Sequence, residues 1–580
     1  MTETSQSEQV NPDPKDASRS RSLATRASAL MGAGTLISRV LGFIRTSLLA
    51  IAIGNTALVG DVFETANTIP NVIYMLLAGG VFNVVLVPQI IKQAKKADRG
   101  ADYTSRLITL AAIVIGAFTI AITVLAAPII QALTMGWAEP KLVLGTVFAF
   151  WTLPQIFFYG MYAIIGQVLN AHGRFGAYMW APVVNNVIAI GFILFYLASF
   201  GSYNGEPGAE QLAAWTSTQT VVLAGGHTIG IIMQAVVLLW PLKRLGLGLK
   251  PKFGWKGMGL RHTGRIAGFT IVTMTVGNIS NLMINRLVTG ATEARSQLGV
   301  GVEEAGVPGL QALNITQLIT VLPHSVFVLS ISTVLFNQLS RSMQARDMDT
   351  VRRTTGTGLR TFAVPMMISV VGVIVLAPPV ARLFAGSAET AVIAAHVTAQ
   401  ILILLALGMP LRSAHFYLLR VFYAAENAMI PMIVQVGAAA ISLSLAYGVA
   451  PLVAVENIAY LIALIFTVVH ALQLTLTHIL VKRHYGDYGT KAVLFTYVRT
   501  GWAGVVAGVF GVALLYPMGG YTGGWAMASI TNAILACAVV GTVMVAVYLV
   551  ACRIFQVTEL NQFTAPITNR LRRTPSKQDS

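Results

Sequence analysis

The stretch that decides the fold is MGAGTLISRVLGFIRTSLLAIAIG, residues 31–54. It is apolar and long enough to cross a bilayer, which takes about 20 residues of helix, yet it holds two arginines, Arg39 and Arg45. A charged side chain near the middle of a bilayer costs at least about 2.5 to 3.5 kcal/mol, so it usually faces a protein interior or a water-filled cavity. The stretch therefore predicts a membrane-spanning helix that lines a cavity.

Snorkelling is the alternative, in which a long side chain lies along its helix while the guanidinium reaches the lipid headgroups. Arg45 lies about 13 Å before Gly54 on a helix. Arg39 lies about 20 Å after Arg26. The two arginines are about 9 Å apart along the axis and about 120° apart around it, so one wide cavity wall can present both. We expect them to face a lumen.

The composition is that of a polytopic membrane protein. Of the 580 residues, 55% are hydrophobic and 11% are charged, whereas about a quarter of the residues in soluble globular proteins are charged. Recurrent apolar stretches predict an all-α polytopic membrane protein with about fourteen transmembrane helices. Their expected cores are residues 30–54, 65–91, 107–132, 143–170, 176–200, 219–242, 266–290, 309–339, 357–384, 391–423, 428–449, 455–481, 494–516 and 527–551.

The net charge of +17 follows the expected topology. Basic residues cluster after the second, sixth, eighth and twelfth spans and at the C-terminus, which all lie on one side if the spans alternate. The loops on the other side carry acids, including Asp61, Glu64, Glu206 and Glu293. By the positive-inside rule both termini are cytoplasmic, which requires an even number of spans. Topology therefore explains the basic excess, and a nucleic-acid partner is not expected.

Two helical hairpins resemble each other at an offset of six spans. They are QVLNAHGRFGAYMWAPVVNN at 167–186 and RVFYAAENAMIPMIVQVGAA at 420–439, as in parallel transporter repeats. The implied architecture is two six-helix lobes plus two C-terminal helices. The expected parts are a disordered cytoplasmic tail (1–23), an N-lobe (24–242), a basic cytoplasmic linker (243–265), a C-lobe (266–481), the last two helices with their preceding basic loop (482–553) and a basic cytoplasmic tail (554–580).

Polar residues of the seventh span form a candidate cavity wall. Asn278, Asn281 and Asn285 are three and four residues apart and share one helix face, with Arg286 next to the last. Such a stripe suits phosphate or sugar hydroxyls, and the alternative is helix packing through amide hydrogen bonds. A weaker set on the eighth span comprises Asn314, Thr316, Gln317 and His324.

Arginine offers a planar fork of donors that suits phosphate oxygens and stays charged when buried. Arg39 and Arg45 from one lobe and Arg286 from the other would make a site for an anionic headgroup such as a pyrophosphate. Carboxylates are almost absent from the spans, which argues against a carrier of metal ions or cationic drugs. No histidine or cysteine cluster has metal-site spacing, so we expect no metal, and we expect core or interface roles for His396, His415, His470 and His478.

Three segments carry a family signature: SRVLGFIR at 38–45, DVFETANTIPN at 61–71 and GVFNVVLVP at 80–88. With them, the chain resembles the MviN/MurJ family of the multidrug/oligosaccharidyl-lipid/polysaccharide exporter superfamily over most of its length. The resemblance implies a lipid II flippase with a central cationic cavity and a groove beside the last two helices for a polyprenyl tail. Members carry undecaprenyl-pyrophosphate-linked disaccharide pentapeptide across the bacterial cytoplasmic membrane, for peptidoglycan synthesis, by alternating access.

The family's essential first-helix arginines map onto Arg39 and Arg45, and its acidic residue at the head of the second helix maps onto Asp61. Together with the polar positions above, the predicted substrate-binding residues are Ser38, Arg39, Arg45, Asp61, Asn71, Asn278, Asn281, Asn285, Arg286 and Gln317.

The chain departs from the family pattern in its charges. Thr46 stands where many relatives have an aspartate, Tyr74-Met75 replaces a common basic pair, and Gln317-Leu318 replaces an arginine of the eighth span. We therefore expect Arg286 to supply the missing C-lobe charge. The eleventh span lacks the carboxylate of the sodium site seen in some members. Sodium coupling is therefore not expected, and the membrane potential is the expected driving force with no cofactor.

Three other functions compete with lipid II transport. An exporter of another polyprenyl-pyrophosphate-linked saccharide is the alternative, because such headgroups share the pyrophosphate. A membrane glycosyltransferase needs an outer-face carboxylate with acid–base geometry, and the outer loops 200–218 and 290–308 hold only scattered glutamates. A scaffold for cell-division proteins needs no arginines at the bilayer centre, although a flippase can also bind cell-division or cell-wall synthesis proteins. We expect a transporter and not an enzyme, with lipid II and membrane lipids as partners.

Overall fold

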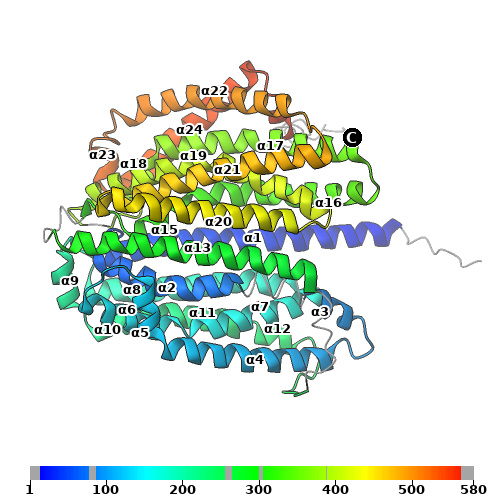
Figure 1. Cartoon of the computed structure of the whole chain (residues 1–580), viewed down its shortest axis with the longest axis horizontal. Helices are drawn as coiled ribbons and strands as arrows, with labels where there is room; N and C mark the ends of the chain where they lie inside the picture. The colour runs from blue at the N-terminus through cyan, green and yellow to red at the C-terminus, as the bar shows by residue number, and fades with distance from the viewer. Residues whose placement is uncertain (1–13, 77–86, 255–263, 299–304, 387, 564–580) are drawn as a thin grey trace, which may run out of the picture.

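The computed structural model describes residues 14–76, 87–254, 264–298, 305–386 and 388–563, and in these ranges the chain forms helices and no strand. The helices run nearly parallel to one long axis (Figure 1). Those of the first half are α1 (Pro14–Ile53), α2 (Leu58–Met75), α3 (Val87–Ala94), α4 (Ala101–Val124), α5 (Ala126–Leu133), α6 (Glu139–Thr152), α7 (Gln155–Ala171), α8 (Phe175–Phe200), α9 (Gly208–Ala214), α10 (Ser217–Thr220), η2 (Val221–Gly225), α11 (Gly226–Val236) and α12 (Leu239–Lys243).

The second half of the chain continues the bundle. Its helices are α13 (Gly264–Ser296), α15 (Leu310–Pro323), η3 (His324–Val328), α16 (Leu329–Gln344), α17 (Met348–Val375), α18 (Ala377–Arg382), α19 (Ala391–Ala424), α20 (Met429–Val449), η4 (Ala450–Leu452), η5 (Val455–Asn457), α21 (Ile458–Tyr485), α22 (Thr490–Leu515), α23 (Trp525–Ala528), α24 (Ile530–Ile554) and η6 (Thr558–Leu560).

The helices form two groups, which lie on either side of α1 and α13 in Figure 1. α1 packs on α8, as α13 packs on α20. α8 packs on α11, as α20 packs on α21, and α2 packs on α6, as α15 packs on α19. Each of these contacts in the first group therefore has a counterpart in the second group, between the spans that lie six positions later in the chain. We call α1 to α12 the N-lobe and α13 to α21 the C-lobe; α22 and α24 pack on each other and on α17 at the C-lobe edge.

Twelve of the described helices are long and apolar enough to cross a membrane. The two expected spans that are not among them are 65–91 and 266–290. Residues 77–86 of the first lie outside the described residues. The second lies within α13, a continuous helix of 33 residues, about 50 Å long, whose asparagines and arginine lower its hydropathy. The all-α membrane fold is confirmed, and the count of about fourteen spans stays a prediction.

The helix α1 begins earlier than expected. It starts at Pro14, so residues 14–23 of the expected disordered tail lie in a helix. Proline suits the first helical position, and the alanines, arginines and leucine that follow favour helix. The expected terminal stretches 1–13 and 564–580 and most of the signature segment 80–88 lie outside the described residues, and the other expected domain boundaries stay predictions.

The helix ends gather at two opposite ends of the bundle. The start of α1 and the end of α24 lie toward the right of Figure 1, with the loops between α3 and α4 and between α16 and α17, and we call this the basic end. The opposite end carries α9, α10 and α23. An even number of crossings places the start of the first helix and the end of the last span on one side of the bundle.

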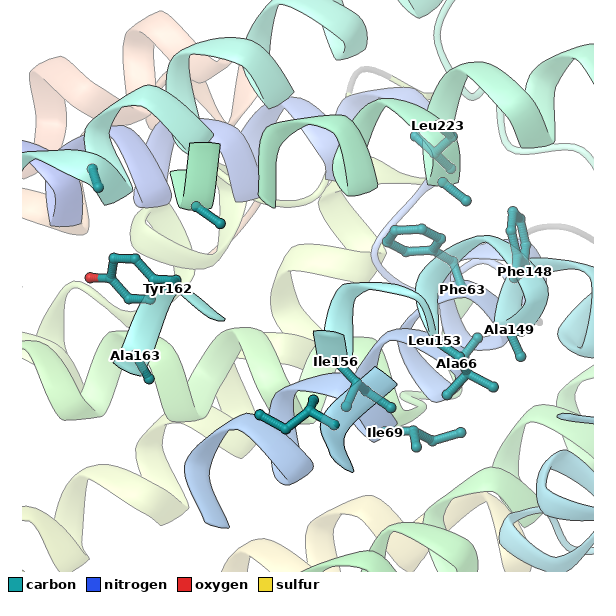
Figure 2. Close-up of a cluster of buried hydrophobic side chains, with 14 of the residues drawn as sticks. Phe63, Ala66, Ile69, Phe148, Ala149, Leu153, Ile156, Tyr162, Ala163 and Leu223 are labelled. Atoms are coloured by element: carbon teal, nitrogen blue, oxygen red, sulfur yellow. The ribbon is translucent and has the colours of Figure 1, made fainter. Parts of the chain in front are cut away.

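A buried apolar cluster holds α2 firmly in the N-lobe (Figure 2). Phe63 of α2 and Phe148 of α6 are fully buried and meet edge to face, with ring centroids 5.4 Å apart. Ala66 and Ile69 of α2 continue the same cluster toward Ile156 of α7. Such close packing leaves little freedom to the start of α2, where Asp61 lies.

Candidate functional site

The two arginines of α1 face protein groups at the boundary between the lobes. Arg39 is half-buried, and one of its guanidinium N–H groups donates to Ser325 Oγ of η3 in the C-lobe. Arg45 is also half-buried, and it lies within electrostatic range of the Glu64 carboxylate of α2. The contact from Arg39 to the other lobe is what the lumen-facing interpretation requires.

Glu64 also reaches across this boundary. One of its carboxylate oxygens accepts a hydrogen bond from Asn314 Nδ2 of α15, at 3.0 Å. The inner side of the boundary thus holds arginines from α1, a carboxylate from α2 and amide or hydroxyl groups from the C-lobe.

Asp61, in the first turn of α2, is fully buried and binds the C-lobe with both oxygens. Its Oδ2 accepts from Arg295 Nη2 at 2.6 Å and from Thr292 Oγ1 at 2.8 Å, both on α13. Its Oδ1 accepts from the backbone N–H of Gln311 at 2.8 Å, in the first turn of α15. The N-cap residue of α15 is Gly309, which has no side chain that can cap the helix. The Asp61 carboxylate therefore caps α15 from the other lobe.

Arg295 is as buried as its partner, with side-chain exposures of 1% for Arg295 and 0% for Asp61. Its Nη1 donates to the Val307 carbonyl at 3.0 Å. Removing one partner of such a buried ion pair costs about 3 to 5 kcal/mol, because the other charge is left uncompensated. The closed contact between the lobes therefore depends on both charges being present.

Of the further contacts that join the lobes around this pair, we single out four. They are Lys141 Nζ to Glu293 Oε2 at 2.5 Å, Trp137 Nε1 to the Thr289 carbonyl at 3.0 Å, Arg286 Nε to the Thr134 carbonyl at 3.3 Å, and Asn55 Nδ2 to Thr398 Oγ1 at 3.1 Å. We call these four contacts and the Asp61–Arg295 pair the interlobe seal. The seal closes the boundary between the lobes at the end of the bundle opposite the basic end.

Two glycines let the helix starts meet within the seal. A Cβ atom added at Gly309 would lie 1.6 Å from Asp61 Oδ2, and one at Gly60 would lie 1.8 Å from Gln311 Oε1. A Cβ atom at Gly309 would therefore displace the Asp61 carboxylate, and one at Gly60 would also lie 2.5 Å from the Gly54 carbonyl oxygen. The sequence therefore fits a state in which these two helix starts touch.

Two of the predicted binding residues are hydrogen-bonded within the N-lobe. Ser38 accepts from Asn186 Nδ2 of α8, at 2.8 Å through its carbonyl and 3.3 Å through its hydroxyl oxygen. Asn71 donates to the Asn67 carbonyl of its own helix at 2.8 Å and accepts from Tyr159 Oη at 3.3 Å. Both side chains are half-buried, and their role toward a substrate stays a prediction.

The polar stripe of α13 shares a face, but its members have different surroundings. Asn278 donates to the Met274 carbonyl of its own helix at 2.8 Å. Asn285 is buried, and its Oδ1 has no hydrogen-bond partner among the described residues. Arg286 belongs to the seal, and no hydrogen bond of the described residues joins it to the arginines of α1. The expected three-arginine site stays a prediction.

Two adjoining cavities of about 440 and 240 Å³ lie inside the C-lobe, between α13, α15, α19 and α21. Asn281, Arg412 and His470 line both. Gln317 lines the smaller one, so the structure brings Asn281 and Gln317, both predicted binding residues, to one place. His470, for which we expected a core or interface role, thus lies in a cavity wall.

Sequence reasoning missed two arginines. Arg412 lies well inside α19, an apolar helix of 34 residues, so the argument applied to Arg39 would have found it. Arg295 gave no comparable signal, because a basic residue in the last turn of a helix is common at a protein surface. Only the three-dimensional contact with Asp61 reveals its role.

An apolar cavity of about 380 Å³ lies toward the edge of the C-lobe. Its walls come from α17, α19, α21 and α22, with side chains such as Leu359, Met367, Leu474 and Leu494. The expected groove for a lipid tail lies beside the last two helices, and α22 is one of these. The assignment of this space to a lipid tail stays a prediction.

Comparison with protein families gives a match over most of the chain. A family model described as lipid II flippase MurJ matches residues 49–551. The chain is 27% identical over 364 residues to a probable lipid II flippase MurJ of Haemophilus influenzae, a match that covers 60% of this chain and 65% of the relative. It is 28% identical over 367 residues to the protein of the same name from Vibrio cholerae, covering 61% of this chain and 64% of the relative.

These two matches span slightly less than two thirds of each relative. A longer match joins the chain to a probable lipid II flippase MurJ of Rhizobium meliloti, at 26% identity over 445 residues, with 74% of this chain and 76% of the relative covered.

Two solved structures share the fold. A lipid II flippase MurJ in an inward closed conformation superposes with a TM-score of 0.65 at 19% identity, covering 90% of this chain and 98% of that chain. An inward-facing MATE family transporter of the MOP superfamily superposes with a TM-score of 0.58 at 15% identity, covering 79% and 95%. At these identities the superpositions are evidence for the fold alone.

Proposed function

The chain belongs to the lipid II flippase MurJ family, and from this premise we propose that it moves lipid II from the cytoplasmic to the outer leaflet of the bacterial cytoplasmic membrane. The observation that carries the proposal is the interlobe seal. A fully buried ion pair between Asp61 and Arg295 closes one end of the boundary between the lobes, and the arginines of α1 lie on the same boundary further inside. A boundary closed at one end and cationic within is one half of an alternating-access cycle.

The seal gives the cycle two definable states. In the closed state, the Asp61 carboxylate is held by three donors from the C-lobe. In the open state, water would take the place of these donors. Exchange of a buried pair for two hydrated charges changes the free energy little compared with the loss of one partner, so a bound ligand can shift the balance between the states.

Arg39 and Arg45 are the proposed ligands of the pyrophosphate. The hydrogen bond from Arg39 to Ser325 across the boundary supports this assignment, because it places a guanidinium donor where the two lobes meet. A phosphate oxygen accepts a stronger, charge-assisted hydrogen bond than a serine hydroxyl. Binding of the headgroup would therefore replace this contact and change what holds the lobes together.

The membrane potential is the proposed source of energy. Each unit charge moved through 100 mV is worth about 2.3 kcal/mol, and the headgroup is anionic. Helix α20 contains no aspartate or glutamate that could hold a sodium ion. The protein is proposed to act as a transporter, with no covalent step.

The test is complementation in cells depleted of their own lipid II flippase, with the lipid II exposed at the cell surface as the readout. We expect the parent to restore exposure, and Arg39→Ala and Arg45→Ala to reduce it at least about tenfold, the equivalent of about 1.4 kcal/mol. Arg244→Ala, at an exposed arginine of the basic end, is the matched control and should transport normally.

The same assay tests the energy source in spheroplasts. Replacement of sodium by potassium should leave exposure unchanged, while collapse of the membrane potential should reduce it. Equal transport by the parent and by both α1 variants at equal expression would refute the proposed binding site.

A further inference from the structure

Arg412 lines two cavities inside the C-lobe, and none of the described residues pairs a carboxylate with it. It lies in α19, twelve residues before the end of that helix at Ala424, about 18 Å along the axis. Its Nη2 donates to the Thr320 carbonyl at 3.2 Å, and its Nε has no partner among the described residues. A cation at such a depth is paired or lines an aqueous space in most membrane proteins.

The space beside Arg412 is polar and lacks negative charge. Both adjoining cavities have Arg412 in their walls, and none of the residues that line either of them is a carboxylate. Asn281 and Gln435 line the larger cavity and supply amide N–H groups. The polar groups of this chamber therefore suit an anion and would not hold a metal cation.

The three histidines of the larger cavity are each engaged through Nδ1. His324 contacts Ser413 Oγ at 2.9 Å, and His470 contacts Gln473 Oε1 at 3.1 Å. His415 contacts Thr477 Oγ1 at 2.9 Å. With neutral imidazoles, the ordinary state of histidine above pH 7, Arg412 carries the only fixed charge among the residues that line the chamber.

We propose that this C-lobe chamber binds one small monovalent inorganic anion, of the halide class, against the guanidinium of Arg412. One positive charge and neutral amide donors match a single negative charge, whereas a phosphate dianion or a pyrophosphate would need further cations. All residues that line the chamber come from C-lobe helices, and neither Arg39 nor Arg45 is among them, although Arg39 contacts Ser325, the neighbour of His324 in the chamber wall. The inference does not depend on the identity of the transported lipid.

The test uses the purified full-length protein in detergent, with chloride and bromide as probes. At equal ionic strength, chloride should raise the melting temperature relative to gluconate, with a saturable dependence on concentration. Arg412→Gln should abolish this chloride-specific shift. Arg420→Gln, which removes a half-buried arginine two turns further along α19 that stacks on Phe416, should retain it.

Further measurements keep the test decisive if Arg412→Gln does not fold. Arg412→Lys keeps the charge but loses the fork, so the chloride concentration for half of the effect should rise severalfold. Crystals grown in bromide should show an anomalous peak beside the Arg412 guanidinium.

Three results would overturn the inference. They are an equal chloride response in the parent and in either Arg412 variant, bromide peaks only elsewhere, and displacement of the bromide at Arg412 by added lipid II, which would assign the chamber to the headgroup.

Discussion

At the scale of single residues, Asp61 has a double role that few side chains could fill. Its carboxylate neutralises Arg295 and also caps the start of α15 through the Gln311 N–H. Each charge lies at the end of its own helix that favours it, since Asp61 is in the first turn of α2 and Arg295 in the last turn of α13. An amide at position 61 would present an N–H₂ group to donors and lose the charge.

Neutralising one member of this pair should destabilise the protein strongly. We expect Asp61→Asn and Arg295→Gln each to cost about 3 kcal/mol, because the other charge stays buried without a partner. The double variant should lose less than the sum of the two, with a coupling of about 1 to 3 kcal/mol. Thermal unfolding of the purified variants measures both effects.

The control for this cycle is the exposed pair Asp102–Arg106, whose side chains are 47% and 34% accessible. Its neutral variants should each cost less than about 1 kcal/mol. Equal melting temperatures for the buried-pair and exposed-pair variants would show that the seal does not depend on Asp61 and Arg295.

At the residue scale, the sequence indicates which charged residues matter but not which residues they contact. Arg39 and Arg45 stand out because arginine is costly in an apolar helix, and the contact of Arg39 with Ser325 agrees with a lumen-facing position. Asp61 was identified through its motif, but its partner Arg295 is more than two hundred residues away in the chain. Pairing over such a separation depends on how the lobes meet, which no local pattern encodes.

At the scale of elements, the seal depends on the contact between the starts of α2 and α15. Gly309 removes the side chain that would otherwise occupy the position of the Asp61 carboxylate. The same absence leaves the start of α15 without a cap of its own. The Asp61 carboxylate therefore caps the start of α15 only when the lobes are closed at this end.

Gly309→Ala should keep the seal open. The added methyl group would lie on Asp61 Oδ2, so either the carboxylate would leave its donors or α15 would move away from α2, and the closed state would be disfavoured. A cysteine at Asn314, which contacts Glu64 further inside the boundary, reports the opening through its labelling by a membrane-impermeant thiol reagent. The native Cys537 and Cys552 are replaced in this background, and we expect labelling to rise severalfold.

Gly290→Ala is the matched control for that variant. Gly290 lies on α13 near the seal, and a Cβ atom there would meet its nearest neighbours at an ordinary 3.7 Å. Its labelling should equal that of the parent. If Gly309→Ala labelled no faster than Gly290→Ala, the close approach of the two helices would not control access.

The polar stripe of α13 shows what periodicity can and cannot give. The spacing of its asparagines places them on one helix face, yet only Asn281 of the predicted stripe lines the C-lobe chamber. Arg286 instead contacts the Thr134 carbonyl of the N-lobe. Helical phase indicates which residues share a face, whereas the environment along that face changes with every turn as different neighbours pack against it.

At the scale of the whole molecule, the resemblance between two hairpins predicted a larger repeat. The packing of α1 on α8 and of α13 on α20 shows the same arrangement in both halves. The hydropathy pattern was sufficient to predict the helices, because a helix in a membrane must satisfy its backbone polar groups with hydrogen bonds of its own. The hydropathy pattern could not predict the conformation, since the contacts that define it, such as Asp61–Arg295, join residues far apart in the chain.

The central claim is that the interlobe seal must open for transport. Asn55 and Thr398 meet across it with 3.1 Å between Nδ2 and Oγ1, so cysteines at both positions can be joined by a short thiosulfonate cross-linker. Gln155 and Thr228, 2.8 Å apart within the N-lobe, provide a control pair that crosses no boundary between lobes.

The decisive measurement is surface exposure of lipid II in cells that carry each cysteine pair, before cross-linking, after it, and after reduction. We predict that linking Asn55→Cys to Thr398→Cys stops exposure, that reduction restores it, and that the control pair has no effect. Unchanged exposure with the Asn55–Thr398 link complete would contradict it.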